Sequence, residues 1–175
     1  MLGKYGRKIM IDLYEFVAFI ERNFDLVTGV PCSYFKEFLS YITNKEKLAI
    51  KHLYATREDE AVAIAAGVAL SKKKALIYMQ NSGLGNIGDA LTSLAQLYKL
   101  PMLILVSYRG LKEDDDFPEH SIMGKINNSL MDALNLRYWD LTEDNWQKNI
   151  KQAIALMNEK PSPVVLLVKK GVLCQ

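Results

Sequence analysis

The residues best suited to chemistry stand between Tyr78 and Gly88, where an apolar run gives way to small and amide side chains. Within this stretch, Gly83-Leu-Gly85-Asn-Ile-Gly88 matches the G-x-G-x-x-G spacing, which lets a backbone approach a phosphate closely. We expect residues 75–79 to form a buried strand and residues 84–99 a helix. A polar loop between a strand and a helix lies at the carboxyl end of an α/β sheet, where ligands bind. The stretch therefore predicts a binding loop.

A dinucleotide is one ligand for such a loop, but two features count against it. The match follows the third predicted strand rather than the first, and the next strand ends in Ser107-Tyr108-Arg109 without an acid for a ribose. Arg109 would suit a 2′-phosphate, so an NADP-binding protein stays open as an alternative. In a further alternative, the glycines serve only a tight turn.

Acidic residues and two histidines are the other candidates for chemistry. Glu58 begins a predicted helix over 58–70; acids favour that position because of the helix dipole, yet small uncharged residues follow it. His120 follows a long polar loop at the start of another helix. His52 lies inside a strand, where we expect it to pack or to lie on an exposed edge rather than to do chemistry. We interpret the run Asp114-Asp-Asp116 as a solvated turn.

Strands and helices alternate along the whole chain, which predicts how these residues are positioned. We expect an α/β fold of three layers, with a mostly parallel six-stranded sheet flanked by helices. Ser33 is expected to cap the second helix. Residues 1–10 are expected to form a flexible arm and residues 11–175 a single domain. The expected strands cover 24–30, 48–54, 75–79, 101–107, 137–141 and 163–169.

The composition of the chain limits the kinds of partner that we expect. The chain has 175 residues, 50% of them hydrophobic, and a net charge of +2, which does not favour nucleic acid or a membrane as partner. No apolar run approaches the roughly 20 residues that span a bilayer. The two cysteines, Cys32 and Cys174, have no metal-ligand spacing, so we expect no metal site in this chain and a cytoplasmic location.

Three segments carry a resemblance to a known family. Met79-Gln-Asn-Ser-Gly-Leu-Gly-Asn86, with Gly29-Val-Pro31 upstream and Arg109-Gly110 downstream, resembles the pyrimidine-binding domain of thiamine-diphosphate-dependent decarboxylases. Within these enzymes, the chain is most similar to the sulfopyruvate and phosphonopyruvate decarboxylases. The resemblance covers nearly the whole chain from about residue 11. It implies the thiamine-diphosphate-binding fold.

The resemblance also implies roles for particular residues. A glutamate nine positions before a glycine hydrogen-bonds the cofactor's aminopyrimidine in this family and activates it; here that spacing selects Glu58 and Gly67. His120 matches a histidine that transfers protons near the substrate. The implied cofactor-binding residues beside Glu58 are Asn81, Ser82, Gly83, Gly85 and Asn86. The residues expected near the substrate are Val30, Pro31 and Cys32. For an acidic tail, the expected donors are Arg109 or, as an alternative, the start of the helix near His120.

One family motif is missing from the chain. Enzymes of this class hold the diphosphate and its Mg²⁺ through Gly-Asp-Gly on a second domain, and this sequence has no Gly-Asp-Gly. We therefore expect an α subunit that works in a hetero-oligomer with a β subunit, which brings the diphosphate-binding domain and the metal. The expected reaction converts sulfopyruvate to sulfoacetaldehyde and CO₂. Phosphonopyruvate decarboxylation is the alternative within the family, and a non-catalytic scaffold subunit the alternative outside it.

Overall fold

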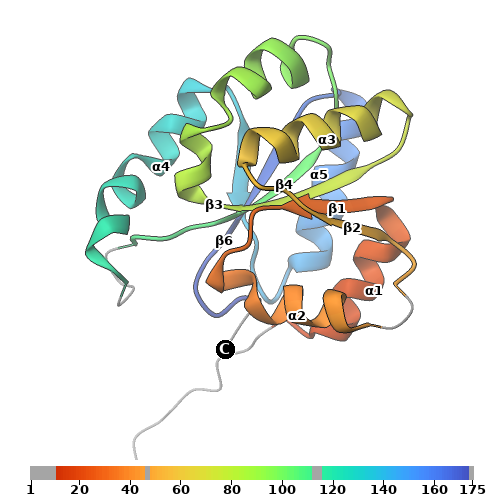
Figure 1. Cartoon of the computed structure of the whole chain (residues 1–175), viewed down its shortest axis with the longest axis horizontal. Helices are drawn as coiled ribbons and strands as arrows, with labels where there is room; N and C mark the ends of the chain where they lie inside the picture. The colour runs from red at the N-terminus through yellow and green to blue at the C-terminus, as the bar shows by residue number, and fades with distance from the viewer. Residues whose placement is uncertain (1–10, 46–47, 112–115, 174–175) are drawn as a thin grey trace, which may run out of the picture.

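The computed structural model describes residues 11–45, 48–111 and 116–173, and the expected arm over 1–10 lies outside these ranges. Six strands form one sheet in the order β2-β1-β3-β4-β6-β5, and every neighbouring pair is parallel (Figure 1). This confirms the predicted α/β class. The strands are β1 (Leu26–Gly29), β2 (Lys51–Tyr54), β3 (Ala75–Gln80), β4 (Leu103–Ser107), β5 (Arg137–Asp140) and β6 (Val164–Val168).

Helices cover both faces of the sheet (Figure 1). On one face lie α1 (Leu13–Asn23), α2 (Lys36–Asn44) and α5 (Trp146–Glu159); on the other lie α3 (Glu58–Leu70), a π-helix η3 (Ala90–Gln96) and α4 (Ser121–Ala133). Strand β3 shows how the layers are divided. Leu76 and Tyr78 point into the α1–α2–α5 core, whereas Ile77 and Met79 point into the α3–η3–α4 core. Because side chains alternate along a strand, a central parallel strand must be apolar throughout.

Two local predictions are wrong. Ser33 does not cap α2; it begins a short 3-10 turn, η1 (Ser33–Phe35), and its hydroxyl accepts a hydrogen bond from Arg109 instead. The expected continuous helix over 84–99 is divided into a 3-10 turn, η2 (Asn81–Gly85), and the π-helix η3. No helix in the described part of the chain is long and apolar enough to cross a membrane.

The carboxyl ends of the central strands come together at one edge of the sheet, as parallel pairing requires. Gly29 at the end of β1 packs on the carbonyl of Tyr78 so closely that a Cβ there would lie 1.9 Å from that oxygen. Val30 then donates its backbone N–H to the same carbonyl at 3.2 Å. The turn after β1 is therefore fixed beside the loop after β3, at the point where strand order reverses between β1 and β3.

Candidate active site

The carboxylate of Glu58 lies against the loop that follows β3. Glu58 is the first residue of α3, and its Oε2 accepts a hydrogen bond of 2.9 Å from Nδ2 of Asn86. A Cβ added to Gly83 would lie 2.4 Å from Cγ of Glu58, so glycine leaves the space that the glutamate fills. The structure thus brings together Glu58, Gly83 and Asn86, three residues selected from the sequence.

The first turn of α3 carries two more acids, and both point elsewhere. Asp59 pairs with Arg57 at 3.0 Å. Glu60 accepts hydrogen bonds from the backbone N–H and the hydroxyl of Thr56, at 2.7 and 2.6 Å. Glu58 is therefore the member of this acidic triplet that faces the loop.

The remaining loop residues have different environments. Asn81 is fully buried, and its Nδ2 donates to the carbonyl of Arg109 at 2.9 Å, which ties the loop after β3 to the end of β4. Ser82 is exposed and accepts a hydrogen bond of 2.9 Å from Nε2 of Gln80. Gly85 is also exposed, with open space where a Cβ would stand. Asn81 therefore anchors the loop from its buried side, while Ser82 and Gly85 lie on its exposed side.

A second polar cluster lies at the end of β4. Arg109 is buried; its Nε donates to Oδ2 of Asp116 at 2.8 Å, its Nη2 donates to Oδ1 of the same carboxylate, and its Nη1 donates to Oγ of Ser33 at 2.7 Å. The guanidinium also lies over the ring of Tyr34, 4.6 Å from its centroid. The hydrogen bonds from Arg109 hold the pKa of Asp116 well below its usual range, and the pKa of Arg109 is raised in return.

This cluster corrects one interpretation from the sequence. Asp116 was expected in a solvated turn, but its side chain is 5% exposed. Besides Arg109, it accepts backbone N–H bonds from Gly110 and Phe117, each at 2.9 Å. Burial of the carboxylate is possible because four N–H donors, two from Arg109 and two from the backbone, replace its water. Asp114 and Asp115 lie outside the described residues.

His120 joins the same cluster. Its Nδ1 lies 2.9 Å from Oδ1 of Asp116, and its side chain is 15% exposed. The backbone is placed by two glycines: a Cβ on Gly110 would lie 2.0 Å from the carbonyl oxygen of His120, and one on Gly124 would lie 2.1 Å from that of Gly110. The start of α4 can dock on the end of β4 only because both positions lack a side chain.

The turn after β1 contributes the third group. The buried Sγ of Cys32 lies 3.0 Å from Oγ of Ser107 and 3.7 Å from Oε1 of Gln80, so β1, β3 and β4 are linked by side chains at their carboxyl ends. Pro31 is exposed at the rim of a shallow hollow of about 390 Å³. The residues that line this hollow are Pro31, Cys32, Ser33, Lys36, Leu39 and Tyr54.

Sequence reasoning missed Asp116, Ser33 and Ser107. Their signal is weak, because serines and aspartates are common in turns, and the contacts that define their roles cross 7, 76 and 75 positions of the chain. Each of the three becomes recognisable only when the carboxyl ends of the strands are placed side by side.

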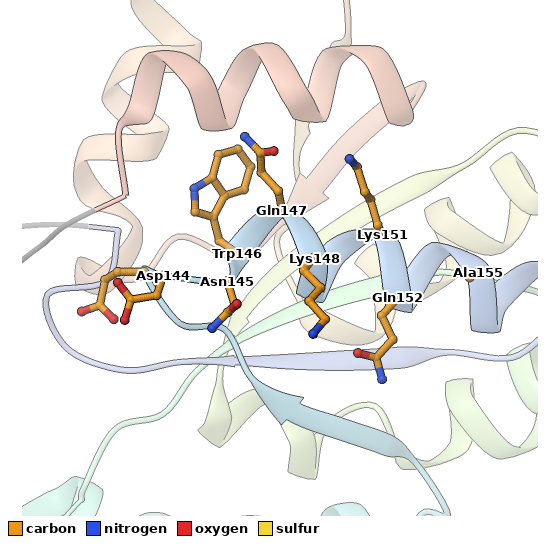
Figure 2. A pocket seen from close by; sticks show the side chains of 9 residues that line it. Asp144, Asn145, Trp146, Gln147, Lys148, Lys151, Gln152 and Ala155 are labelled. Atoms are coloured by element: carbon orange, nitrogen blue, oxygen red, sulfur yellow. The ribbon is translucent and has the colours of Figure 1, made fainter.

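A larger hollow, of about 840 Å³, lies elsewhere (Figure 2). Its described lining residues all belong to α5 and the turn before it, from Glu143 to Ala155. Figure 2 shows their side chains spreading away from one another along the helix. Trp146, the large apolar group among them, packs on Phe16 and Phe19 of α1. This surface does not gather groups that do chemistry, so the site at Glu58 is the better candidate.

The chain matches a family model and several characterised relatives. Residues 16–134 match the model "Thiamine pyrophosphate enzyme, N-terminal TPP binding domain". Sulfopyruvate decarboxylase subunit alpha of Methanococcus maripaludis is 36% identical over 153 residues, which cover 86% of this chain and 89% of that protein. Its counterpart in Methanocaldococcus jannaschii is 38% identical over 152 residues, which cover 86% and 88%. Phosphonopyruvate decarboxylase of Streptomyces viridochromogenes is 33% identical, but the match covers 83% of this chain and 37% of that longer protein.

The fold has a close counterpart among solved structures. A thiamine diphosphate-dependent 4-hydroxybenzoylformate decarboxylase of Rhodococcus jostii superposes with a TM-score of 0.66 at 20% identity, over 90% of this chain and 29% of that one. At that identity the likeness speaks for the fold alone, whereas the family model spans most of the chain. The chain belongs to the thiamine pyrophosphate enzyme family, and residues 16–134 are its N-terminal TPP-binding domain.

Proposed function

We propose that this chain is the α subunit of a thiamine-diphosphate-dependent decarboxylase that converts sulfopyruvate to sulfoacetaldehyde and CO₂. One observation carries the proposal: a glutamate at the start of α3 is held by Asn86 against the glycine of the loop after β3. The relatives named sulfopyruvate decarboxylase subunit alpha, which match along most of their length, support the same reaction.

The residues present fit an aminopyrimidine ring. Glu58 is partly exposed, and Asn86 binds one carboxylate oxygen, Oε2, which leaves Oε1 able to accept a hydrogen bond from a ring nitrogen. The loop forms a wall with little side-chain bulk, made of Ser82, Gly83 and Gly85. The buried Asn81 anchors this wall to the end of β4. A dinucleotide pyrophosphate fits less well, because it would face the Glu58 carboxylate beside Gly83.

Thiamine diphosphate supplies the electron sink that loss of CO₂ from a 2-keto acid requires. This chain contributes the groups around that chemistry. Glu58 would hydrogen-bond the pyrimidine ring of the bound cofactor, and the walls formed by η2 and the turn after β1 would orient the ring and the keto acid. We assign to His120 the exchange of a proton near the substrate through Nε2, because its Nδ1 contacts Asp116.

The acidic tail of the substrate requires donors at the same edge of the sheet. Three of the five N–H groups of Arg109 donate to Asp116 and Ser33, and the side chain of Cys32 also hydrogen-bonds the guanidinium, which leaves one N–H group for a sulfonate. Cys32, the partly buried Val30 and the exposed Pro31 line the approach. Phosphonopyruvate remains the second candidate, because its decarboxylase in Streptomyces viridochromogenes is 33% identical to this chain.

A partner chain completes the proposal. The family holds the diphosphate and Mg²⁺ through Gly-Asp-Gly, which this sequence lacks, so a β subunit is proposed to hold both. Helix α3 offers that partner a surface next to Glu58: it carries no charged residue after Glu60, and Ala63 and Gly67 are exposed. The free thiol of Cys32 fits a reducing cytoplasm.

The experiment uses the chain purified together with the proposed β subunit, thiamine diphosphate and Mg²⁺. We expect release of CO₂ from sulfopyruvate, and Glu58→Gln should remove most of this activity while the subunits still assemble. Glu60→Gln is the matched control, because Glu60 lies in the same helical turn but faces Thr56. Full activity of Glu58→Gln, or micromolar NADPH binding by calorimetry, would contradict the proposal.

A further inference from the structure

Asp116 is the centre of the second polar cluster, and the proposed reaction gives it no role. Asp116 accepts hydrogen bonds from Arg109, from two backbone N–H groups and from Nδ1 of His120, all at a side chain that is 5% exposed. A buried carboxylate with so many donors is rigid, since every change of rotamer breaks several bonds at once. Asp116 therefore holds each of its hydrogen-bond partners, His120 included, in one orientation.

An ionised carboxylate accepts hydrogen bonds and donates none. Arg109 binds both oxygens of Asp116 and keeps the pKa of this acid well below its usual range, so Asp116 is ionised at neutral pH. The contact of 2.9 Å with Nδ1 of His120 is then a hydrogen bond only if Nδ1 carries the proton. A neutral His120 consequently has its lone pair on Nε2, which has no hydrogen-bond partner among the described residues.

We propose that Asp116 is a positioning residue for the decarboxylation: it fixes the Nδ1–H tautomer of His120 and presents Nε2 to the site as the proton-accepting atom. This inference rests on the proposed function only for the role of His120 in the reaction. The tautomer is a property of the chain itself. In this arrangement the Asp116 carboxylate also stabilises the imidazolium that forms when Nε2 takes up a proton.

Arg109 has a second role in this arrangement. It neutralises the buried Asp116 and ties it to Ser33 of the turn after β1, so the histidine, the substrate turn and the loop anchored by Asn81 share one hydrogen-bonded network. Loss of Asp116 leaves a buried guanidinium without its partner, and folding of such variants must be checked. For that reason the decisive measurement is made on the wild-type chain.

Long-range ¹H–¹⁵N NMR spectra of the full ¹⁵N-labelled chain report which imidazole nitrogen carries the proton. The chain has two histidines, and His120→Gln assigns the signals. In the wild type we expect the neutral His120 ring in the Nδ1–H form. An Nε2–H form would overturn the proposal whether or not the protein is a decarboxylase.

A variant pair extends the test. Asp116→Ala should shift His120 towards the tautomer mixture of an unrestrained imidazole, whereas Asp140→Ala, which removes an exposed aspartate paired with Lys169, should leave the pattern unchanged. An unchanged His120 pattern in a folded Asp116→Ala chain would also overturn the proposal.

Decarboxylase activity provides a test that is independent of the NMR measurement. In the complex with the β subunit, Asp116→Ala should lower kcat on the order of tenfold to a hundredfold, as is typical for residues that orient a reacting group. The double variant with His120→Gln should be no slower than His120→Gln alone, because Asp116 acts through the histidine. Additive losses would contradict this. Absence of decarboxylase activity in the wild type would instead count against the proposed function, while the NMR result would still stand.

Discussion

The side chain of Glu58 occupies the space that a side chain at Gly83 would fill. A Cβ on Gly83 would lie 2.4 Å from Cγ, 2.8 Å from Cδ and 2.9 Å from Oε1 of Glu58. The glycine therefore serves the position of a carboxylate rather than an unusual backbone angle. Of the three glycines in the G-x-G-x-x-G match, this is the one whose role is sterically defined.

Substitution Gly83→Ala should displace the Glu58 carboxylate without unfolding the protein. The added methyl overlaps a flexible side chain, which can rotate away, so the free energy of unfolding should change by about 1 kcal/mol or less. Decarboxylase activity with the β subunit should fall about a hundredfold, as for a misplaced reacting group. The control is Gly88→Ala, where a Cβ meets its nearest atom at 4.0 Å. Equal activity of the two variants would argue against the placement of Glu58.

Close backbone approach at α4 gives a second prediction, this time for stability. Gly110 has φ of +76°, and its Cβ would lie 2.0 Å from the carbonyl oxygen of His120, so Gly110→Ala should destabilise the fold by about 3 kcal/mol. Gly124→Ala should also destabilise the fold, because its Cβ would lie 2.1 Å from the carbonyl oxygen of Gly110. Urea unfolding monitored by circular dichroism checks both variants. Either variant with wild-type stability would show that α4 does not dock as described.

The His52 imidazole predicts a pH dependence. Burial lowers the pKa of His52 from its ordinary value of 6.5, and its Nε2 lies 3.0 Å from the hydroxyl of the buried Tyr78. Below pH 6.5 the unfolded chain binds a proton that the folded chain resists. Stability is therefore present above that pH and is lost as pH falls towards the lowered folded-state pKa.

The check is urea unfolding between about pH 7.5 and 5, where His52→Gln should flatten the loss of stability relative to the wild type. Glutamine can still hydrogen-bond Tyr78 but does not titrate. A variant that loses stability as steeply as the wild type would show that other groups cause the pH dependence.

Most of the fold could be predicted from the sequence because it follows from local patterns. The apolar runs of β3, β4 and β6 and the alternation of strands and helices required a parallel sheet covered on both faces. The π-helix η3 could not be predicted. Its residues have ordinary helical periodicity, and no local pattern distinguishes the i→i+5 hydrogen bonding of a π-helix from that of an α-helix.

The site was predictable only in part, for a physical reason. Glu58, Gly83 and Asn86 were selected from the sequence by their resemblance to a family motif, and the structure brings them together. Asp116 was dismissed, because a run of aspartates is normally solvated. Its burial depends on Arg109 and on two backbone N–H groups whose direction no sequence pattern encodes.

The outer face of α3 gives the last prediction, which concerns assembly. Ala63 and Gly67 are four residues apart and exposed, so they form a small-residue strip on the helix that begins with Glu58. A partner that completes the cofactor site must approach Glu58 closely, and this uncharged strip permits close packing.

Ala63→Arg should leave the stability of the isolated chain within about 0.5 kcal/mol of the wild type, because the position is exposed. It should prevent association with the β subunit in analytical ultracentrifugation, whereas Gln152→Arg, an exposed position on α5 in the opposite layer, should assemble normally. Normal assembly of Ala63→Arg would place the partner on another face.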